Sequence, residues 1–269
     1  MIPIGAEIWV GLAGFGAAMM NAVAGGGTML TFPALLAAGV PPVLANTTST
    51  VALGVGMPGG VWAFRRHLPS VSGWIWPLGI ASLLGGVAGG ILLLALPSEV
   101  FVTVVPWLLL LATALFVLNE PLLRWINRRQ KTMKAAGETG TGGAEAEPKS
   151  PRAWGVAFQT LVGVYGGYFG AGIGIMMLAS LGLLGLRDIN RINALKALLA
   201  LLVNSASIVY FICRGEVEWS LALWLMGGSI PGSIVGARLA QRIPARWIRL
   251  IAAVIGVSIA VGFWVKGEA

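Results

Sequence analysis

Residues 8–64 read IWVGLAGFGAAMMNAVAGGGTMLTFPALLAAGVPPVLANTTSTVALGVGMPGGVWAF and contain no charged side chain. Since one bilayer crossing takes about 20 apolar residues, this stretch is long enough for more than one crossing. Two further stretches, between His67 and Glu99 and between Arg152 and Arg187, are also free of charge. The pattern predicts an all-α integral membrane protein that crosses the bilayer several times.

The composition of the whole chain agrees with this class. Of its 269 residues 57% are hydrophobic and only 10% are charged, and the mean hydropathy is +0.85. Soluble domains carry about 25% charged residues. The formal net charge of +8 raises the question of nucleic acid, but Lys and Arg cluster at segment ends and in one central loop. That is the positive-inside pattern, so we expect the lipid bilayer and no nucleic acid as a partner.

Glycine, proline and charged residues divide the chain into apolar segments. Two of these, 28–38 and 173–185, are too short to cross a bilayer. Residues 124–152 are polar and contain several glycines, which predicts a flexible linker. We therefore divide the chain into a first transmembrane repeat (1–119), a linker (120–152) and a second repeat (153–269). The expected segments are 8–24, 28–38, 43–64, 73–96, 99–119, 153–170, 173–185, 191–213, 218–240 and 246–265.

The two halves share residues at a constant offset of 147 positions. Identical pairs include Gly25/Gly172, Gly27/Gly174, Asn46/Asn193, Gly85/Gly232 and Pro97/Pro244. A constant offset over so long a stretch indicates an internal duplication.

Basic loops follow different segments in the two halves. Arg65 and Arg66 follow the third segment of the first half, whereas Arg242 and Arg246 flank the loop around Pro244, after the fourth segment of the second half. Basic loops stay in the cytoplasm, so the halves are predicted to have inverted topology, with five segments each. The linker is then cytoplasmic and both termini are periplasmic.

Glycine runs precede both short segments. Residues 21–28 read NAVAGGGT, and residues 170–174 read GAGIG. Consecutive glycines break a helix at little steric cost, and a helix that begins after the break points its positive end at it. Two such helix N-termini at mid-depth would form an anion site. The alternative is that these glycines only let helices pack closely.

Polar side chains follow each short segment. Lys196 would supply positive charge, or its ammonium would snorkel to the membrane surface. The side chains of Asn46, Thr47 and Thr48 would surround the substrate, or only cross-link helices. Asp and Glu fall only at the ends of apolar segments, as Glu99 and Glu218 do, or in loops, and this favours a small anionic substrate. The candidate substrate-binding residues are Asn21, Gly25, Gly26, Gly27, Thr28, Asn46, Thr48, Ser49, Gly172, Gly174, Asn193, Lys196 and Asn204.

Enzymatic chemistry is not expected. His67 is the only histidine and lies in a basic loop, and no carboxylate pair lies within the apolar segments. The single cysteine, Cys213, excludes an internal disulfide and a cysteine metal cluster. We predict neither a metal nor another cofactor.

The chain carries five characteristic motifs: NAVAGGG at 21–27, TFPAL at 31–35, PPVLANTTS at 41–49, GAGIG at 170–174 and NALK at 193–196. Together they resemble the TauE/SafE family of sulfite and organosulfonate exporters. The resemblance covers nearly the whole chain outside the linker. It implies a secondary transporter of the bacterial inner membrane that exports sulfite, thiosulfate or small organosulfonates such as sulfoacetate. We expect alternating access. A passive anion channel and a non-transporting subunit that stabilises a partner remain alternatives, and a homodimer is compatible with the sequence.

Overall fold

The structure is a computed structural model that describes residues 5–23, 26–138, 148–239, 254 and 257–258. Within these ranges the chain forms helices joined by short turns and contains no strand. The predicted all-α class is therefore confirmed. The expected segment 246–265 lies outside the described residues, apart from positions 254, 257 and 258.

The helices follow the predicted apolar segments closely. In particular, α2 and α8 have only 10 and 11 residues, which confirms the two short segments. The first-half elements are α1 (Ala6–Val23), α2 (Thr28–Ala37), α3 (Pro42–Gly54), α4 (Met57–Phe64), the 3-10 helix η1 (Arg65–Val71), α5 (Ser72–Ala95) and α6 (Ser98–Glu138). The second-half elements are α7 (Ala153–Tyr168), α8 (Ile173–Leu183), α9 (Ile189–Cys213) and α10 (Trp219–Leu239).

Two elements differ from the prediction. The expected segment 43–64 is divided into α3 and α4, because Pro58 lacks an N–H group and occupies the first turn of a new helix. The flexible linker expected from residue 124 is helical as far as Glu138, where α6 ends. Residues 122–136 contain no Gly or Pro and many good helix formers, so the helix propagates beyond its apolar part.

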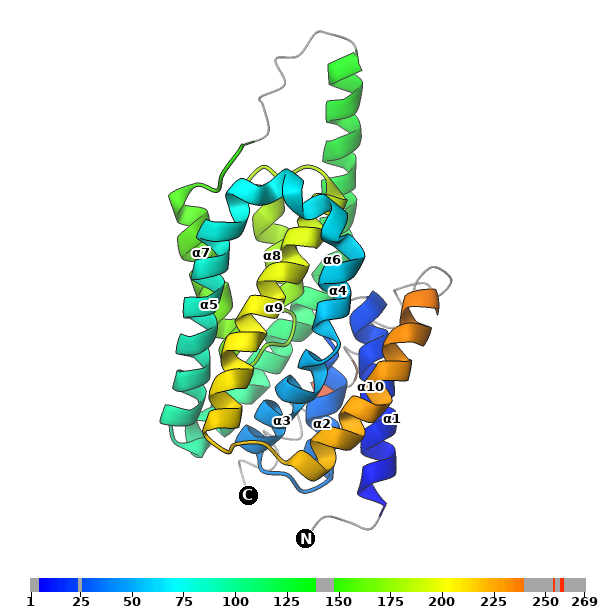
Figure 1. Cartoon of the computed structure of the whole chain (residues 1–269), viewed down its shortest axis with the longest axis vertical. Coiled ribbons are helices and arrows are strands. Elements are labelled where there is room, and N and C mark those ends of the chain that lie inside the picture. Colours follow the sequence, from blue (N-terminus) through cyan, green and yellow to red (C-terminus); the bar gives the residue numbers. More distant parts are fainter. Residues whose placement is uncertain (1–4, 24–25, 139–147, 240–253, 255–256, 259–269) are drawn as a thin grey trace.

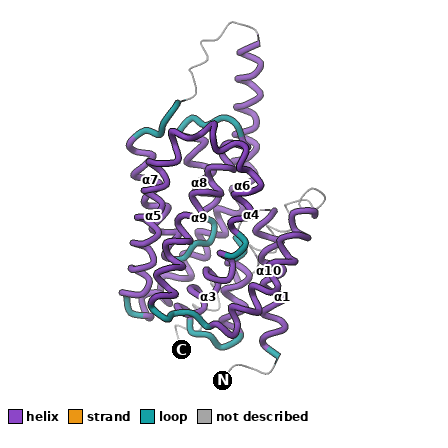
Figure 2. Tube along the Cα trace, in the orientation of Figure 1, coloured by secondary structure: helices purple, strands orange, loops and turns teal. Residues whose placement is uncertain are grey.

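The helices form a bundle in which two hairpins enter from opposite ends (Figures 1 and 2). The hairpin of α1 and α2 begins and ends at the end of the bundle where the α5–α6 loop lies. The hairpin of α7 and α8 begins and ends at the other end, next to η1. Each short helix therefore starts near the middle of the bundle and runs back to the surface from which its hairpin came.

Large apolar side chains project outward from the bundle. On α5 they form one stripe at helical spacing, with Trp76 75% and Leu84 63% exposed and Ile80 and Ile91 also exposed. A stripe of this kind is unfavourable in water and suits a lipid-facing surface. Three stretches of the described chain are long and apolar enough to cross a membrane: Pro42–Ala95, which contains α3 to α5 and turns at η1, Ser98–Leu118 and Ile189–Cys213.

Glycines bring α5 against α7 and α10 against α1. A Cβ atom added at Gly85 would lie 2.5 Å from the carbonyl oxygen of Thr160, and one added at Gly232 would lie 2.8 Å from the Cα of Phe15. Gly85 and Gly232 are a pair at the 147-residue offset, and each faces the first helix of the other half's hairpin. At these two positions close helix packing accounts for the glycine.

The neighbouring glycines Gly227 and Gly228 provide a matched test of this packing. A Cβ atom at Gly228 would overlap the backbone of Gly11 in α1, whereas one at Gly227 would meet no atom within 4 Å. Gly228→Ala should lower the free energy of unfolding by about 1–3 kcal/mol, because α1 and α10 must separate. Gly227→Ala should leave it unchanged or raise it, because Ala favours the helix and meets no neighbour there. Thermal unfolding of the purified protein in detergent measures both, and equal melting temperatures for the two variants would contradict the helix contact.

Candidate functional site

The two short helices begin after backbone breaks that require glycine. Gly26 has φ +114° and Gly172 has φ +81°, both in the region that L side chains rarely adopt. Among the described residues, neither α2 nor α8 has a side-chain cap at its start. By contrast, the carboxylate of Asp188 accepts hydrogen bonds from the first amides of α9. Backbone turns already take some of the first amides, because the amide of Met29 donates to the carbonyl of Gly26 and that of Ile175 donates to the carbonyl of Gly172, both at 3.0 Å. The amides of Thr28 and Gly174 have no acceptor in the described part of the chain, and these two are available to another acceptor.

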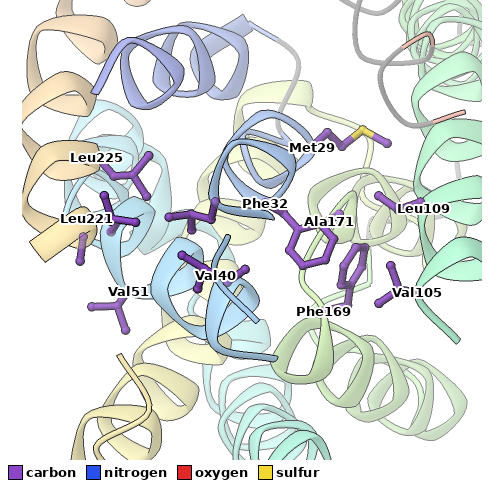
Figure 3. Packing of buried hydrophobic residues seen from close by; sticks show 14 of the residues in the cluster. Met29, Phe32, Val40, Val51, Val105, Leu109, Phe169, Ala171, Leu221 and Leu225 are labelled. Atoms are coloured by element: carbon purple, nitrogen blue, oxygen red, sulfur yellow. The ribbon is translucent and has the colours of Figure 1, made fainter. Parts of the chain in front are cut away.

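Both breaks lie against the same turn of α6. A Cβ atom at Gly26 would overlap the ring of Phe116, and one at Gly172 would lie 3.4 Å from Cδ1 of Leu115 and 3.6 Å from Cα of Ala112. Figure 3 shows the preceding turns of α6, at Val105 and Leu109, facing the segment between α7 and α8. The two breaks are 146 residues apart in sequence, yet both contact the same helix, α6.

Aromatic packing also joins the two hairpins. The ring of Phe32 in α2 meets that of Phe169, which lies in the second break, edge to face, with centroids 5.7 Å apart (Figure 3). Phe101 of α6 completes this group, with its centroid 6.3 Å from that of Phe32. All three side chains are almost completely buried. The rings hold α2 against the residues that lead into α8.

Asn46 of α3 links the two halves with a buried hydrogen bond. Its Nδ2 donates to the carbonyl oxygen of Tyr168 at 2.9 Å. Because a carbonyl only accepts, this bond fixes the orientation of the amide, and Oδ1 must be the remaining acceptor. Asn46 is 1% exposed, and its Oδ1 has no partner in the described part of the chain. An unpaired buried acceptor costs about 1–3 kcal/mol, so this atom is suited to receive a donor from a ligand.

Lys196 lies beside the first turn of α8. A Cβ atom at Gly174, the second residue of α8, would lie 3.7 Å from Cδ of Lys196. Because α9 begins at Ile189, Lys196 lies about 10 Å along the helix from its start. Its aliphatic chain thus packs on the short helix in the interior of the bundle.

Ser49 takes the place of Lys196 in the first half, at the 147-residue offset. Its hydroxyl forms a hydrogen bond with that of Thr31 in α2, and both side chains are fully buried. Ser49 therefore contacts α2 as Lys196 contacts α8, but only Lys196 carries a charge.

The other predicted site residues of the first half have varied surroundings. Asn21 is exposed, and its Oδ1 accepts a hydrogen bond from the amide of Gly26 at 3.0 Å. Gly27 is buried, and a Cβ atom there would lie 2.7 Å from the carbonyl oxygen of Ala17, so close packing requires this glycine. Thr28 is partly exposed at the start of α2. Gly25 lies outside the described residues.

The remaining three predicted site residues are Thr48, Asn204 and Asn193. The hydroxyl of Thr48 accepts from the amide of Glu218 at 2.9 Å, immediately before α10. Asn204 donates to the carbonyl of Ala200 at 2.8 Å, about two turns beyond Lys196. Asn193 is partly exposed on the first turns of α9. Thr48 thus links α3 to the start of α10, as the helix-linking alternative expects, whereas the bond of Asn204 lies within α9.

The sequence interpretation did not include the tyrosines at the second break. The hydroxyl of Tyr165 donates to the carbonyl of Ala171 at 2.7 Å and so fixes the turn before α8. Tyr168 supplies the carbonyl that Asn46 binds. A signal was present, because two of the chain's three tyrosines fall within this one turn.

A comparison with protein families matches the model described as "Sulfite exporter TauE/SafE" to residues 10–263. The chain belongs to the TauE/SafE family. This membership confirms the resemblance seen in the sequence motifs, and it places the apolar helices in a membrane protein.

Relatives of this TauE/SafE protein are named as membrane transporters. A "Probable membrane transporter protein" of Haemophilus influenzae is 29% identical over 227 residues, covering 84% of this chain and 82% of the relative. "Probable membrane transporter protein ORF9" of a Sinorhizobium species is 25% identical over 252 residues, covering 93% and 89%. "Probable membrane transporter protein YfcA" of Escherichia coli K12 is 28% identical over 234 residues, covering 85% and 77%. No solved structure gives a significant match.

Proposed function

We propose that this TauE/SafE protein is a secondary transporter that exports small sulfur-containing anions, such as sulfite, thiosulfate or sulfoacetate, across the bacterial inner membrane. One observation carries the proposal: two uncapped helix N-termini lie against the same turn of α6 in the interior of an apolar bundle. Helix N-termini favour anions because their amides are unpaired and the helix dipole is positive there. The family description supports sulfur as the element that the anion contains.

The distribution of charge supports an anionic substrate. Lys196 brings a positive charge to the first turn of α8. Acidic residues of the described helices lie near helix ends, as Glu7 and Glu99 do, or beyond the apolar span of α6, as Glu120 does. A cation bound at the breaks would meet positive groups without a carboxylate to balance them.

Alternating access is the mechanism that this arrangement favours. The two hairpins enter from opposite ends, and each packs on a helix of the other half. An inverted repeat of this kind can rock about a central site, exposing it first to one side and then to the other. The segment 246–265 would be the fifth element of the second repeat. Asn46 and Lys196 would then contact the anion from α3 and α9, one in each repeat.

The charges at the two ends of the bundle give an orientation. The end that contains η1 and the start of α9 carries Arg65, Arg66, Arg152 and Arg187, whereas in the opposite loop after α9 Arg214 is outweighed by Glu216 and Glu218. The positive-inside rule places the basic end in the cytoplasm. The extension of α6 is then cytoplasmic and α1 begins on the periplasmic side, so the α1–α2 hairpin faces the periplasm.

Ligand-dependent stability tests this function directly. The purified protein is heated in detergent with sulfite, thiosulfate, sulfate, sulfoacetate, acetate or chloride at matched ionic strength. An anion present at 100 times its dissociation constant should stabilise the fold by about 2.7 kcal/mol. We expect selective stabilisation by one or more of the reduced sulfur anions or sulfoacetate. Equal melting temperatures in every salt would contradict an anion site.

Liposomes containing the protein separate transport from the two alternatives. A secondary transporter gives saturable uptake of radiolabelled sulfite that accelerates when unlabelled sulfite is trapped inside. Flux that does not saturate and shows no counter-exchange would indicate a passive channel. Binding without any flux would favour a subunit that stabilises a partner.

A further inference from the structure

Thr113 lies on the turn of α6 that joins the two breaks. It follows Ala112, whose Cα faces Gly172, and precedes Phe116, whose ring faces Gly26. Residues three apart are neighbours on one face of a helix, so Thr113 lies beside Phe116 at the first break. Thr113 is only 8% exposed.

The hydroxyl of Thr113 has no hydrogen-bond partner in the described part of the chain. Threonines in apolar helices usually satisfy the hydroxyl with the carbonyl four residues earlier. Thr50, Thr103 and Thr160 all do so here, bonding to the carbonyls of Asn46, Glu99 and Val156. For Thr113 this acceptor would be Leu109, and the bond is not formed. Its hydroxyl is therefore left as a free donor in a buried place.

We propose that Thr113 is an anion-binding residue of the site between the two breaks. This inference rests on the proposed function and adds α6 as a third helix that contacts the anion. The hydroxyl donates a hydrogen bond to an oxygen of the bound oxyanion, while the amides of Thr28 and Gly174, at the starts of α2 and α8, donate to its other oxygens. Asn46 Oδ1, the other unpartnered buried atom at the breaks, accepts a hydrogen bond from the anion when the anion carries an O–H group.

The proposal predicts opposite effects on binding and on stability. Thr113→Val keeps the shape but removes the hydroxyl, so the purified protein should bind sulfite and thiosulfate at least about tenfold more weakly. Its melting temperature without anion should stay the same or rise, because an unpaired buried hydroxyl is replaced by an apolar group. Thr113→Ser keeps the donor and should retain most of the affinity. Calorimetric titration with each anion and thermal unfolding provide the two readouts.

Thr103→Val is the matched control on the same helix. Its hydroxyl is exposed and bonded to Glu99, about 15 Å along α6 from Thr113, so anion affinity should not change. Wild-type affinity in Thr113→Val would overturn this inference and leave the proposed function standing. A lower melting temperature with unchanged affinity would assign Thr113 a structural role instead. A wild-type protein that binds neither anion would overturn both proposals.

Discussion

Replacing Lys196 with Met should weaken anion binding by about 10- to 150-fold while the protein remains folded. A hydrogen bond to a charged group contributes about 1.5–3 kcal/mol, and each 1.4 kcal/mol corresponds to a tenfold change in the dissociation constant. Met fills a similar volume, and it keeps the apolar contact that the aliphatic chain of Lys196 makes beside Gly174. The unliganded melting temperature should therefore fall little or not at all.

Arg65→Met is the control for the loss of a positive charge. Arg65 is exposed, stacks over the ring of Trp62 with its guanidinium carbon 3.8 Å from the centroid, and lies at the end of the bundle. Its removal should leave the dissociation constant for sulfite unchanged. The measurement is calorimetric titration at two ionic strengths, which separates a direct contact from a long-range field. Equal losses in Lys196→Met and Arg65→Met would remove Lys196 from the site.

Replacing Gly26 with Ala should have the largest effect on folding. The backbone at Gly26 has φ +114°, and the added Cβ atom would overlap the ring of Phe116 in α6. Strain from the backbone and overpacking each cost about 1–3 kcal/mol, so we expect a loss of about 2–5 kcal/mol in the free energy of unfolding. The added methyl group would also move the start of α2 away from α6, and this should weaken anion binding.

Two further variants separate the causes. Gly39 also has positive φ, at +83°, but a Cβ atom there would meet nothing within 4 Å, so Gly39→Ala should show the backbone strain alone. Phe116→Leu in the Gly26→Ala background should recover part of the stability, because a smaller side chain leaves room for the new methyl group. If the losses at Gly26 and Gly39 were equal, the contact with Phe116 would not contribute. Thermal unfolding of the wild type, Gly26→Ala, Phe116→Leu and the double variant completes the double-mutant cycle, and Gly39→Ala is measured beside them.

The hydropathy pattern and the positions of glycine and proline predicted most of the fold. A bilayer-spanning helix must satisfy its backbone internally and present apolar side chains, so charge-free stretches such as 68–98 specify helices directly. The two short helices were predictable because glycine ends a helix at low steric cost wherever it is clustered. The division at Pro58 and the extension of α6 to Glu138 do not follow from hydropathy, because they depend on the missing N–H group of proline and on helix propensity.

The sequence alone thus determined the class of the protein, the place of both breaks and the charged residue beside one of them, since each follows from local chemistry. Only the tertiary structure decided which polar groups meet. Asn46 binds Tyr168, Thr48 binds Glu218, and Thr113 stands on the turn that joins Gly26 to Gly172. These pairings depend on how helices far apart in the chain pack at close range. Packing of that kind is cooperative over the whole bundle and leaves no local signal in the sequence.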